Sequence, residues 1–282
     1  MALTEVIKEL LENGVHFGHL SKHWNPKMKK FIFGKKKNIY IIDLEKTAEK
    51  LEEAKEFAKK IVQGGERILF VATKKQLRDL IKEQAIACNM PYVVERWVGG
   101  LLTNYSTIRS RIKRYVGLLE KRDNGEFDKI PRKEVTKLNR EIERMEKIYS
   151  GLKAFDKLPA CIYVVDPKRE IACVKEATRL QIPIIALIDT DANPEVIDYP
   201  IPGNDDAIKS VRYITSLLVD AIKEEAKKAA DLIREAAEAK AAEEENAEPD
   251  VEKYETLEEK IVTDKDKKIL PKKRPSSKEA QK

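Results

Sequence analysis

Short apolar runs alternate with amphipathic segments along most of the chain. Compact runs rich in β-branched residues predict strands at residues 38–43, 67–73, 91–95, 160–166 and 183–189. Apolar residues at helical spacing predict helices at residues 3–12, 44–63, 75–88, 169–180 and 206–240. Such an alternation is typical of parallel strands that are covered on both faces. It predicts an α/β fold with a doubly wound, mostly parallel five-stranded sheet, flavodoxin-like or Rossmann-like.

The interval between the third and fourth predicted strands departs from this alternation. Residues 103–157 contain no strand pattern. One apolar helical face runs from Ile108 to Leu119, and a second runs at near-heptad spacing from Val135 to Phe155, with the turn-rich RDNGEFDKIP between them. Two helices with narrow apolar stripes joined by a turn predict an inserted antiparallel coiled-coil hairpin.

These patterns divide the chain into four regions. We expect an N-terminal helix and cationic arm at 1–37, and an α/β domain at 38–102 and 158–225. We expect the hairpin insertion at 103–157 and an Ala/Glu/Lys-rich helix with a disordered tail at 226–282. A length of 282 residues suits one large domain with appendages.

Positive charge and aromatic residues concentrate between Glu12 and Asp43. No carboxylate occurs between these two acids, whereas the segment contains seven lysines and all three histidines of the protein. It also contains the large aromatic residues Phe17, Trp24, Phe31 and Phe33. Lysines neutralise backbone phosphates, and aromatic faces and imidazoles stack on bases, so we predict a nucleic-acid contact surface, most simply for RNA. The alternative is a solvated arm that keeps the protein soluble, but such an arm has no use for so many large aromatics.

A second cationic group follows the third predicted strand, in ERWVGGLLTNYSTIRSRIKR at residues 95–114. This segment bends at Gly99-Gly100 and enters the first hairpin helix, with Thr103 or Asn104 as the N-cap. Backbone amides at the start of a helix suit a phosphate. A solvated helix face is the alternative reading. The predicted strip comprises Arg96, Asn104, Arg109, Arg111, Lys113 and Arg114.

An enzymatic function is the main rival hypothesis. Asp43, Asp166 and Asp189 end predicted strands at the edge where doubly wound sheets bind ligands, and such a cluster could hold Mg²⁺ or act in phosphoryl chemistry. However, the chain contains neither G-x-G-x-x-G after its first strand nor G-x-x-x-x-G-K-[ST] anywhere, and it has no G-x-S-x-G elbow. An aspartate before a helix is also a common N-cap. We therefore favour structural roles for these aspartates.

The histidines raise the question of a metal. His16, His19 and His23 form H-x-x-H-x-x-x-H, which could supply three imidazoles to zinc. The stretch contains no carboxylate to orient an imidazole, so we favour neutral histidines that stack or hydrogen-bond in an RNA interface, and we expect no cofactor.

Cysteine usage and hydropathy suggest where the protein acts. The three cysteines form no C-x-x-C pair and lie in apolar or helical patterns, as expected for reduced thiols in the cytoplasm. No apolar stretch approaches the roughly twenty residues of a membrane span, so no membrane association is expected. The net charge of +6 suits an acidic partner without establishing one.

Several sequence blocks, in order, resemble the universal small-subunit ribosomal protein S-two family. GVHFGHLSKHWNPKM and NIYIIDLEKT resemble its N-terminal signature, and ILFVATKKQ and RWVGGLLTNYSTI resemble its middle. PACIYVVDPKREIACVKEATRLQIPIIALIDTDANP and PIPGNDDAIKS resemble its C-terminal half. The blocks span about residues 5–220, and the hairpin and histidine-rich arm look like the bacterial branch.

The resemblance implies a ribosome-associated, non-catalytic protein between the head and body of the small subunit. It implies contact with small-subunit ribosomal RNA and neighbouring proteins, and recruitment of the messenger-binding ribosomal protein S-one in support of translation. No obligate homo-oligomer is expected, and a scaffold whose hairpin binds proteins is a further alternative. Carried onto this chain, the resemblance implies RNA contacts by His16, His19, Lys22, His23, Trp24, Asn25, Lys27, Arg96, Gly99, Thr103 and Asn104. Charge adds Lys29, Lys30, Arg109, Arg111, Lys113 and Arg114 to these candidates.

Overall fold

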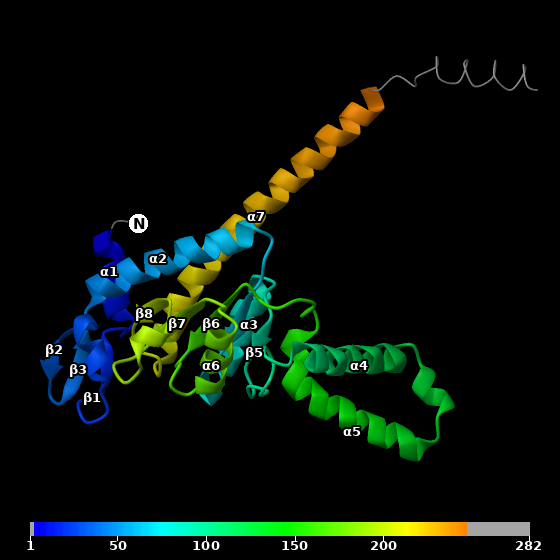
Figure 1. The fold of residues 1–282 in the computed structure, drawn as a ribbon, viewed down its shortest axis with the longest axis horizontal. Coiled ribbons are helices and arrows are strands. Elements are labelled where there is room, and N and C mark those ends of the chain that lie inside the picture. Colours follow the sequence, from blue (N-terminus) through cyan, green and yellow to red (C-terminus); the bar gives the residue numbers. More distant parts are fainter. Residues whose placement is uncertain (1–2, 247–282) are drawn as a thin grey trace, which may run out of the picture. The chain divides into compact units, whose positions relative to one another are not determined.

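A five-stranded parallel sheet is the centre of the fold. The computed structural model describes residues 3–246, and contacts divide the chain into two units after Ala230. The sheet lies in the first unit, with strand order β5-β4-β6-β7-β8 and parallel pairing throughout (Figure 1). Its strands are β4 (Ile68–Val71), β5 (Tyr92–Val93), β6 (Cys161–Val165), β7 (Ile184–Ile188) and β8 (Tyr199–Pro202). The doubly wound α/β class is thereby confirmed.

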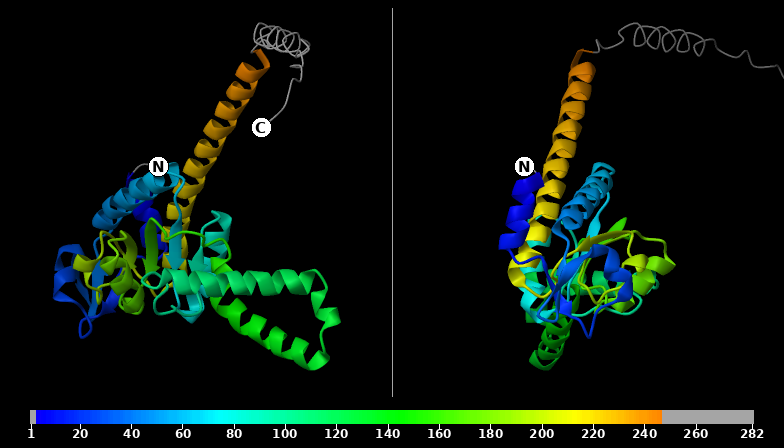
Figure 2. Two further views of the ribbon diagram at one scale, coloured as in Figure 1. Left: turned by 45° about the vertical axis from the view of Figure 1, so that its right-hand side comes forward. Right: turned by 90° about the vertical axis from the view of Figure 1, so that its left-hand side faces the viewer.

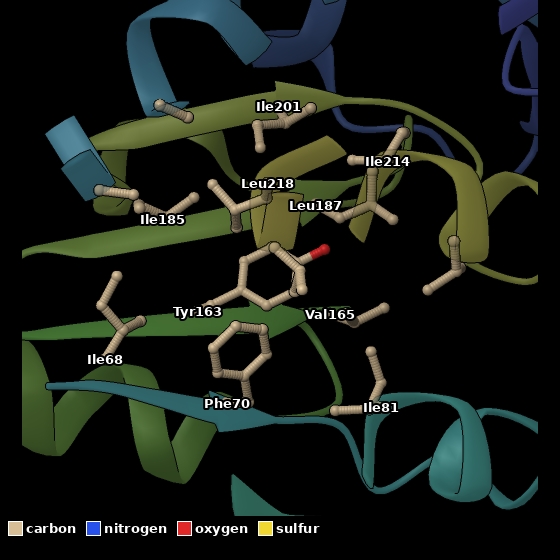
Figure 3. Packing of buried hydrophobic residues seen from close by; sticks show 14 of the residues in the cluster. Ile68, Phe70, Ile81, Tyr163, Val165, Ile185, Leu187, Ile201, Ile214 and Leu218 are labelled. Carbon is tan, nitrogen blue, oxygen red and sulfur yellow. The ribbon is translucent and has the colours of Figure 1, made fainter. Parts of the chain in front are cut away.

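Helices cover both faces of this sheet, because alternate side chains of each buried strand enter two different cores. Residues such as Phe70 and Tyr163 pack with helices α2 (Leu44–Gln63), α3 (Arg78–Ala87) and the first half of α7 (Ile208–Asn246). Figure 3 shows this core, in which the rings of Phe70 and Tyr163 meet edge to face at 5.2 Å. Residues such as Leu69 and Ile162 pack instead with α6 (Ile171–Arg179).

The assignment of one predicted strand was wrong. Residues 38–43 were expected in the main sheet, but β3 (Ile39–Ile42) belongs to a separate antiparallel sheet of order β1-β3-β2, with β1 (Phe17–Leu20) and β2 (Ile32–Lys36). The fifth strand of the main sheet is β8, whose sequence YPIP shows no strand pattern. Proline is tolerated there because β8 is an edge strand.

The predicted cationic arm is a folded module. Helix α1 (Leu3–Glu12) leads into β1, and the 3₁₀ segment η1 (Pro26–Phe31) joins β1 to β2. Lys37 and Asn38 connect β2 to β3 with φ values of 48° and 65°. Positive φ at both central residues is the requirement of a type I′ turn, so this is a tight two-residue hairpin. We call residues 13–42 the arm module.

Helices α4 (Tyr105–Asp123) and α5 (Arg132–Tyr149) follow β5 and pack against each other (Figure 2). The short segment η3 (Glu126–Lys129) connects them, and Ile108, Ile112 and Ile142 are buried along their contact. The remaining 3₁₀ segments are η2 (Lys75–Leu77), η4 (Ser150–Leu152) and η5 (Pro194–Val196). The division into four regions stays a prediction, and its expectation for 247–282 lies outside the described residues.

None of the helices within residues 3–246 is long and apolar enough to cross a membrane.

Candidate nucleic-acid interface

The arm module is attached to the loop that follows β7. The backbone N–H of His19 donates to the hydroxyl of Thr190 at 2.9 Å, and the N–H of Asn25 donates to the Thr190 carbonyl at 2.8 Å. Gly18 permits this approach, because a Cβ at position 18 would lie 2.5 Å from Thr190 Cγ2 and 3.1 Å from the Tyr40 carbonyl oxygen. The backbone of β1 is thus fixed against the carboxyl end of the main sheet.

His19 strengthens this attachment through its side chain. Nδ1 lies 2.9 Å from Oδ2 of Asp189, and Nε2 lies 3.5 Å from Oδ2 of Asp206. The hydrogen bond with Asp189 raises the pKa of His19 to about 9, although burial opposes this shift. His19 is therefore a cation at neutral pH. The expectation of a neutral histidine without an orienting carboxylate was wrong for His19, because both acids come from distant parts of the sequence.

The three strand-end aspartates have different partners. Asp43 caps α2, where its Oδ1 accepts the N–H of Glu45 at 3.1 Å. Asp189 contacts His19, whereas Asp166 contacts Lys74 at 2.8 Å. The proposed three-aspartate cluster is therefore absent from the described residues, and the structural role of Asp43 is confirmed.

Lys74 occupies the centre of the acidic group that does form at this edge. Its Nζ lies 2.8 Å from Asp166, 2.8 Å from Asp205 and 2.9 Å from Asp206. Burial alone would lower the pKa of Lys74, but the three carboxylates raise it above its usual range. Burial raises the pKa of Asp205 to about 7, aided by Asp166 and Asp189 and opposed by Lys74. An internal ammonium group thus occupies the edge where an enzyme of this fold class would bind its ligand.

The three histidines do not assemble into a metal site in the part of the chain that the structure describes. The one group with metal-ligand spacing there is His19, Asp205 and Asp206, whose potential ligand atoms lie within 4.8 Å of one another. A protonated His19 and the adjacent Lys74 ammonium both disfavour a cation at that position. The ring of His16 instead lies against that of Phe17, with centroids 3.9 Å apart and the rings tilted by 40°, and His23 is exposed.

The lysines of the arm module lie on its surface. Lys27 pairs with Glu195, and the Nζ of Lys30 lies 4.9 Å from the centroid of the Phe31 ring. The other five form no ion pair with any described residue and are exposed; they are Lys22, Lys29, Lys35, Lys36 and Lys37. We call these five together with Lys30 the arm lysines. Lys35, Lys36 and Lys37 are not among the RNA contacts predicted from the sequence, although they belong to the same carboxylate-free run.

Two other arm candidates have internal contacts. Trp24 is half-buried, and its ring packs against Tyr40 with centroids 4.9 Å apart. Asn25 caps η1, since its Oδ1 accepts the N–H of Lys27 at 3.0 Å. Both residues therefore shape the module, and less of each side chain is available to RNA than the sequence suggested.

Glu176 on α6 organises the loop between β5 and α4. Its Oε1 accepts from Trp97 Nε1 at 3.0 Å and from the Gly100 N–H at 2.8 Å. Its Oε2 accepts from the N–H groups of Leu102 and Thr103 at 3.0 and 3.2 Å and from the Thr103 hydroxyl at 3.3 Å. Burial would raise the pKa of Glu176, but these donors lower it below its usual range. Glu176 thus occupies amides of the loop that precedes α4, and the expectation that amides at the start of α4 itself bind a phosphate stays a prediction.

The second cationic strip is exposed but separate from the arm module. Arg96, Gly99, Thr103 and Asn104 lie exposed in the loop after β5, and Arg111, Lys113 and Arg114 lie exposed on α4. Arg109 is half-buried, and Arg114 pairs with Glu141 at 2.9 Å. Because β5 and β8 are opposite edges of the main sheet, and the arm module packs at the β7–β8 side, the two groups form no continuous patch (Figure 1).

Comparison with known proteins identifies what this chain is similar to. The family model for ribosomal protein S2 matches residues 10–225. The small ribosomal subunit protein uS2 of Dictyoglomus thermophilum is 55% identical over 219 residues, which cover 78% of this chain and 89% of the relative. The proteins of the same name from Dictyoglomus turgidum and Coprothermobacter proteolyticus are 54% and 49% identical, covering 78% and 77% of this chain and 89% and 81% of the relatives. The match includes the arm module, the main sheet and both hairpin helices, and on this evidence the chain belongs to the ribosomal protein S2 family.

Proposed function

We propose that this protein is a structural component of the small ribosomal subunit that binds the RNA of that subunit through the arm lysines. The relatives carry the name small ribosomal subunit protein. In this proposal the protein is cytoplasmic and ribosome-associated, contacts neighbouring subunit proteins, and helps to recruit the messenger-binding ribosomal protein S-one. The ribosomal protein S2 family is structural, and the chain is not an enzyme.

The observation that supports RNA binding most strongly is the pairing state of the lysines. All six arm lysines are exposed without a carboxylate partner among the described residues. By contrast, Lys50, Lys55 and Lys59 on α2 each contact a glutamate one helical turn away, at 2.7, 2.7 and 3.2 Å. Unpaired ammonium groups gathered on one module attract a polyanion, and phosphate contacts displace counterions from the RNA.

The salt dependence of RNA binding tests the assignment of this surface. Replacing Lys29, Lys35 and Lys36 together by Gln removes three phosphate contacts. The slope of log affinity against log salt should then become shallower by roughly 2 to 3, at about 0.7–0.9 per phosphate. Filter binding of a small-subunit ribosomal RNA transcript over a series of KCl concentrations measures this slope.

A matched control distinguishes the effect of where the lysines lie from the effect of the protein's net charge on RNA binding. Changing Lys50, Lys55 and Lys59 to Gln removes the same charge from a paired face of α2, and this variant should keep the wild-type slope. Equal slopes for all three proteins would overturn the assignment of the arm lysines.

Association with the ribosome is tested in cell lysate. The protein should sediment with small subunits and their assemblies in sucrose gradients at both low and high magnesium. Subunits that lack it should also lack ribosomal protein S-one. A protein that stays at the top of the gradient under both conditions would refute the ribosomal role.

A further inference from the structure

Phe33 leaves its ring in water. It is 79% exposed, the largest exposed fraction of any large apolar side chain in residues 4–229, whose side chains are described. Burying a phenyl ring is among the larger favourable contributions to folding, so a ring this exposed does not stabilise the fold through burial. Phe17 in the same module is 50% exposed and contacts the ring of His16, whereas no ring or cation contact of Phe33 occurs within the described residues. The faces of the Phe33 ring are therefore available to a ligand.

A β-bulge directs Phe33 outward. Strand β2 pairs with β3 at Ile32–Ile42 and next at Gly34–Ile41, so Phe33 is an extra residue without a partner on β3. Regular pairing resumes with Lys35 opposite Tyr40. Extra residues of bulges often re-aim a side chain next to a functional site. Strand β2 is also an edge of its sheet, so no neighbouring strand covers this residue.

The residues around Phe33 are cationic. Lys29 and Lys30 precede it in η1, and Lys35, Lys36 and Lys37 follow it around the hairpin turn. All five are exposed, and none pairs with a carboxylate of the described residues. A free aromatic face among unpaired lysines provides the two elements of single-strand recognition, namely stacking on bases and neutralisation of phosphates.

We propose that Phe33 is a stacking platform for an unpaired base of RNA, with the flanking lysines holding the adjacent phosphates. The ligand is a single-stranded or bulged nucleotide, and the platform tolerates any base because every base has a π-face. This inference rests on the proposed function, in which the arm lysines bind RNA. It adds a site that charge alone does not provide, because lysines bind paired and unpaired RNA alike.

The test compares two RNA probes of equal phosphate number, an oligoadenylate single strand and a blunt duplex. Phe33→Ala should weaken oligoadenylate binding roughly 5- to 140-fold, the range expected for the loss of one base–aromatic stack. Duplex affinity and the salt slope should not change, because no charge is removed. Ile86→Ala, which truncates a 58% exposed side chain on α3, is the matched control and should bind both probes like the wild type.

Two further substitutions distinguish stacking from apolar contact. Phe33→Leu retains apolar surface without a π-face and should lose affinity as Phe33→Ala does. Phe33→Trp should retain affinity, and fluorescence of the added indole should be quenched by oligoadenylate but not by the duplex. Wild-type affinity in the Leu variant, or an equal loss for duplex and single strand in the Ala variant, would overturn the platform.

The outcomes for the platform and for the proposed function are separable. If the wild-type chain binds neither probe in a salt-dependent manner, the RNA-binding function itself is refuted. If it binds both, and the Lys29/Lys35/Lys36 variant has a shallower slope while Phe33→Ala binds oligoadenylate normally, only the platform is refuted. Phe33→Ala should unfold at the same temperature as the wild type, because the ring is exposed. The fluorescence of Phe33→Trp reports stacking independently of any change in the stability of the Ala variant.

Discussion

The ion pair of His19 makes the stability of the fold depend on pH in a predictable direction. Replacing His19 by Gln keeps a side-chain donor for Asp189 but removes the positive charge. The rise in the pKa of His19 from 6.5 to about 9 corresponds to roughly 3 kcal/mol. The His19 side chain is 29% exposed, and solvent screening reduces this to about 2 kcal/mol. His19→Gln should therefore lower the free energy of unfolding by about 2 kcal/mol at acidic to neutral pH.

The sign of the pH dependence follows from the direction of the shift. The folded state holds the proton of His19 more tightly than the unfolded chain does. The stabilisation is therefore complete below pH 6.5 and is lost as the pH rises through about 9. Asp205, whose pKa burial raises to about 7, also makes stability fall with rising pH, but it does so in both proteins. The difference between wild type and variant reports the His19 charge, including its attraction to Asp205.

Urea unfolding across a pH series measures this difference. His23→Gln is the matched control, because His23 is exposed and has no ion pair in the described chain. It should follow the wild type at every pH. A wild-type minus His19→Gln difference that stays constant from pH 6.5 to 9 would refute the assignment of the His19 charge, as would a difference below about 0.5 kcal/mol, the size of an ordinary surface substitution.

Two further substitutions test the internal contacts that hold the β5–α4 loop and the arm module in place. Glu176→Gln should lower the free energy of unfolding, measured in urea, by about 2–3 kcal/mol and should change the near-UV circular dichroism of Trp97. The reason is that the amide NH₂ of Gln would face N–H groups of the β5–α4 loop that need an acceptor. Wild-type stability of this variant would contradict the role of Glu176. Gly18→Ala should lower stability by about 1–3 kcal/mol through its clash with Thr190. Adding Thr190→Ser to this variant removes Cγ2 but keeps the hydroxyl, and should restore much of the lost stability in thermal unfolding. If stability is not restored, the clash that destabilises Gly18→Ala is with another group, such as the Tyr40 carbonyl.

Local pattern was enough to predict the fold class and most of the helices. The strands β4, β6 and β7 are buried on both faces and read as continuous apolar runs. The order in which strands join a sheet is not local, so β3 could not be told from a central strand by its composition. Strand β8 has two prolines and is recognisable as a strand only through its parallel pairing with β7.

The candidate site was predictable only as a charge pattern. The carboxylate-free run identified the arm lysines, because it contains no acid close in sequence that could pair with them. The contacts of His19 with Thr190, Asp189 and Asp206 join parts of the chain about 170 or more residues apart. The contact of Lys27 with Glu195 likewise has no sequence signal. Sequence therefore located the cations but could not say which of them were already paired.

The pairing of charged side chains explains why the arm module suits an external ligand and the acidic edge of the main sheet does not. At the carboxyl edge of the main sheet, Asp166, Asp205 and Asp206 share the Lys74 ammonium, and Asp189 has His19 as its cation. A metal ion or phosphate entering there would have to displace an internal partner and leave a buried charge uncompensated, which is strongly unfavourable. The arm lysines have only water and counterions to exchange, so a polyanion binds there without breaking the fold. The acidic edge thus holds the arm module in place, and the arm module presents the charge that remains unpaired.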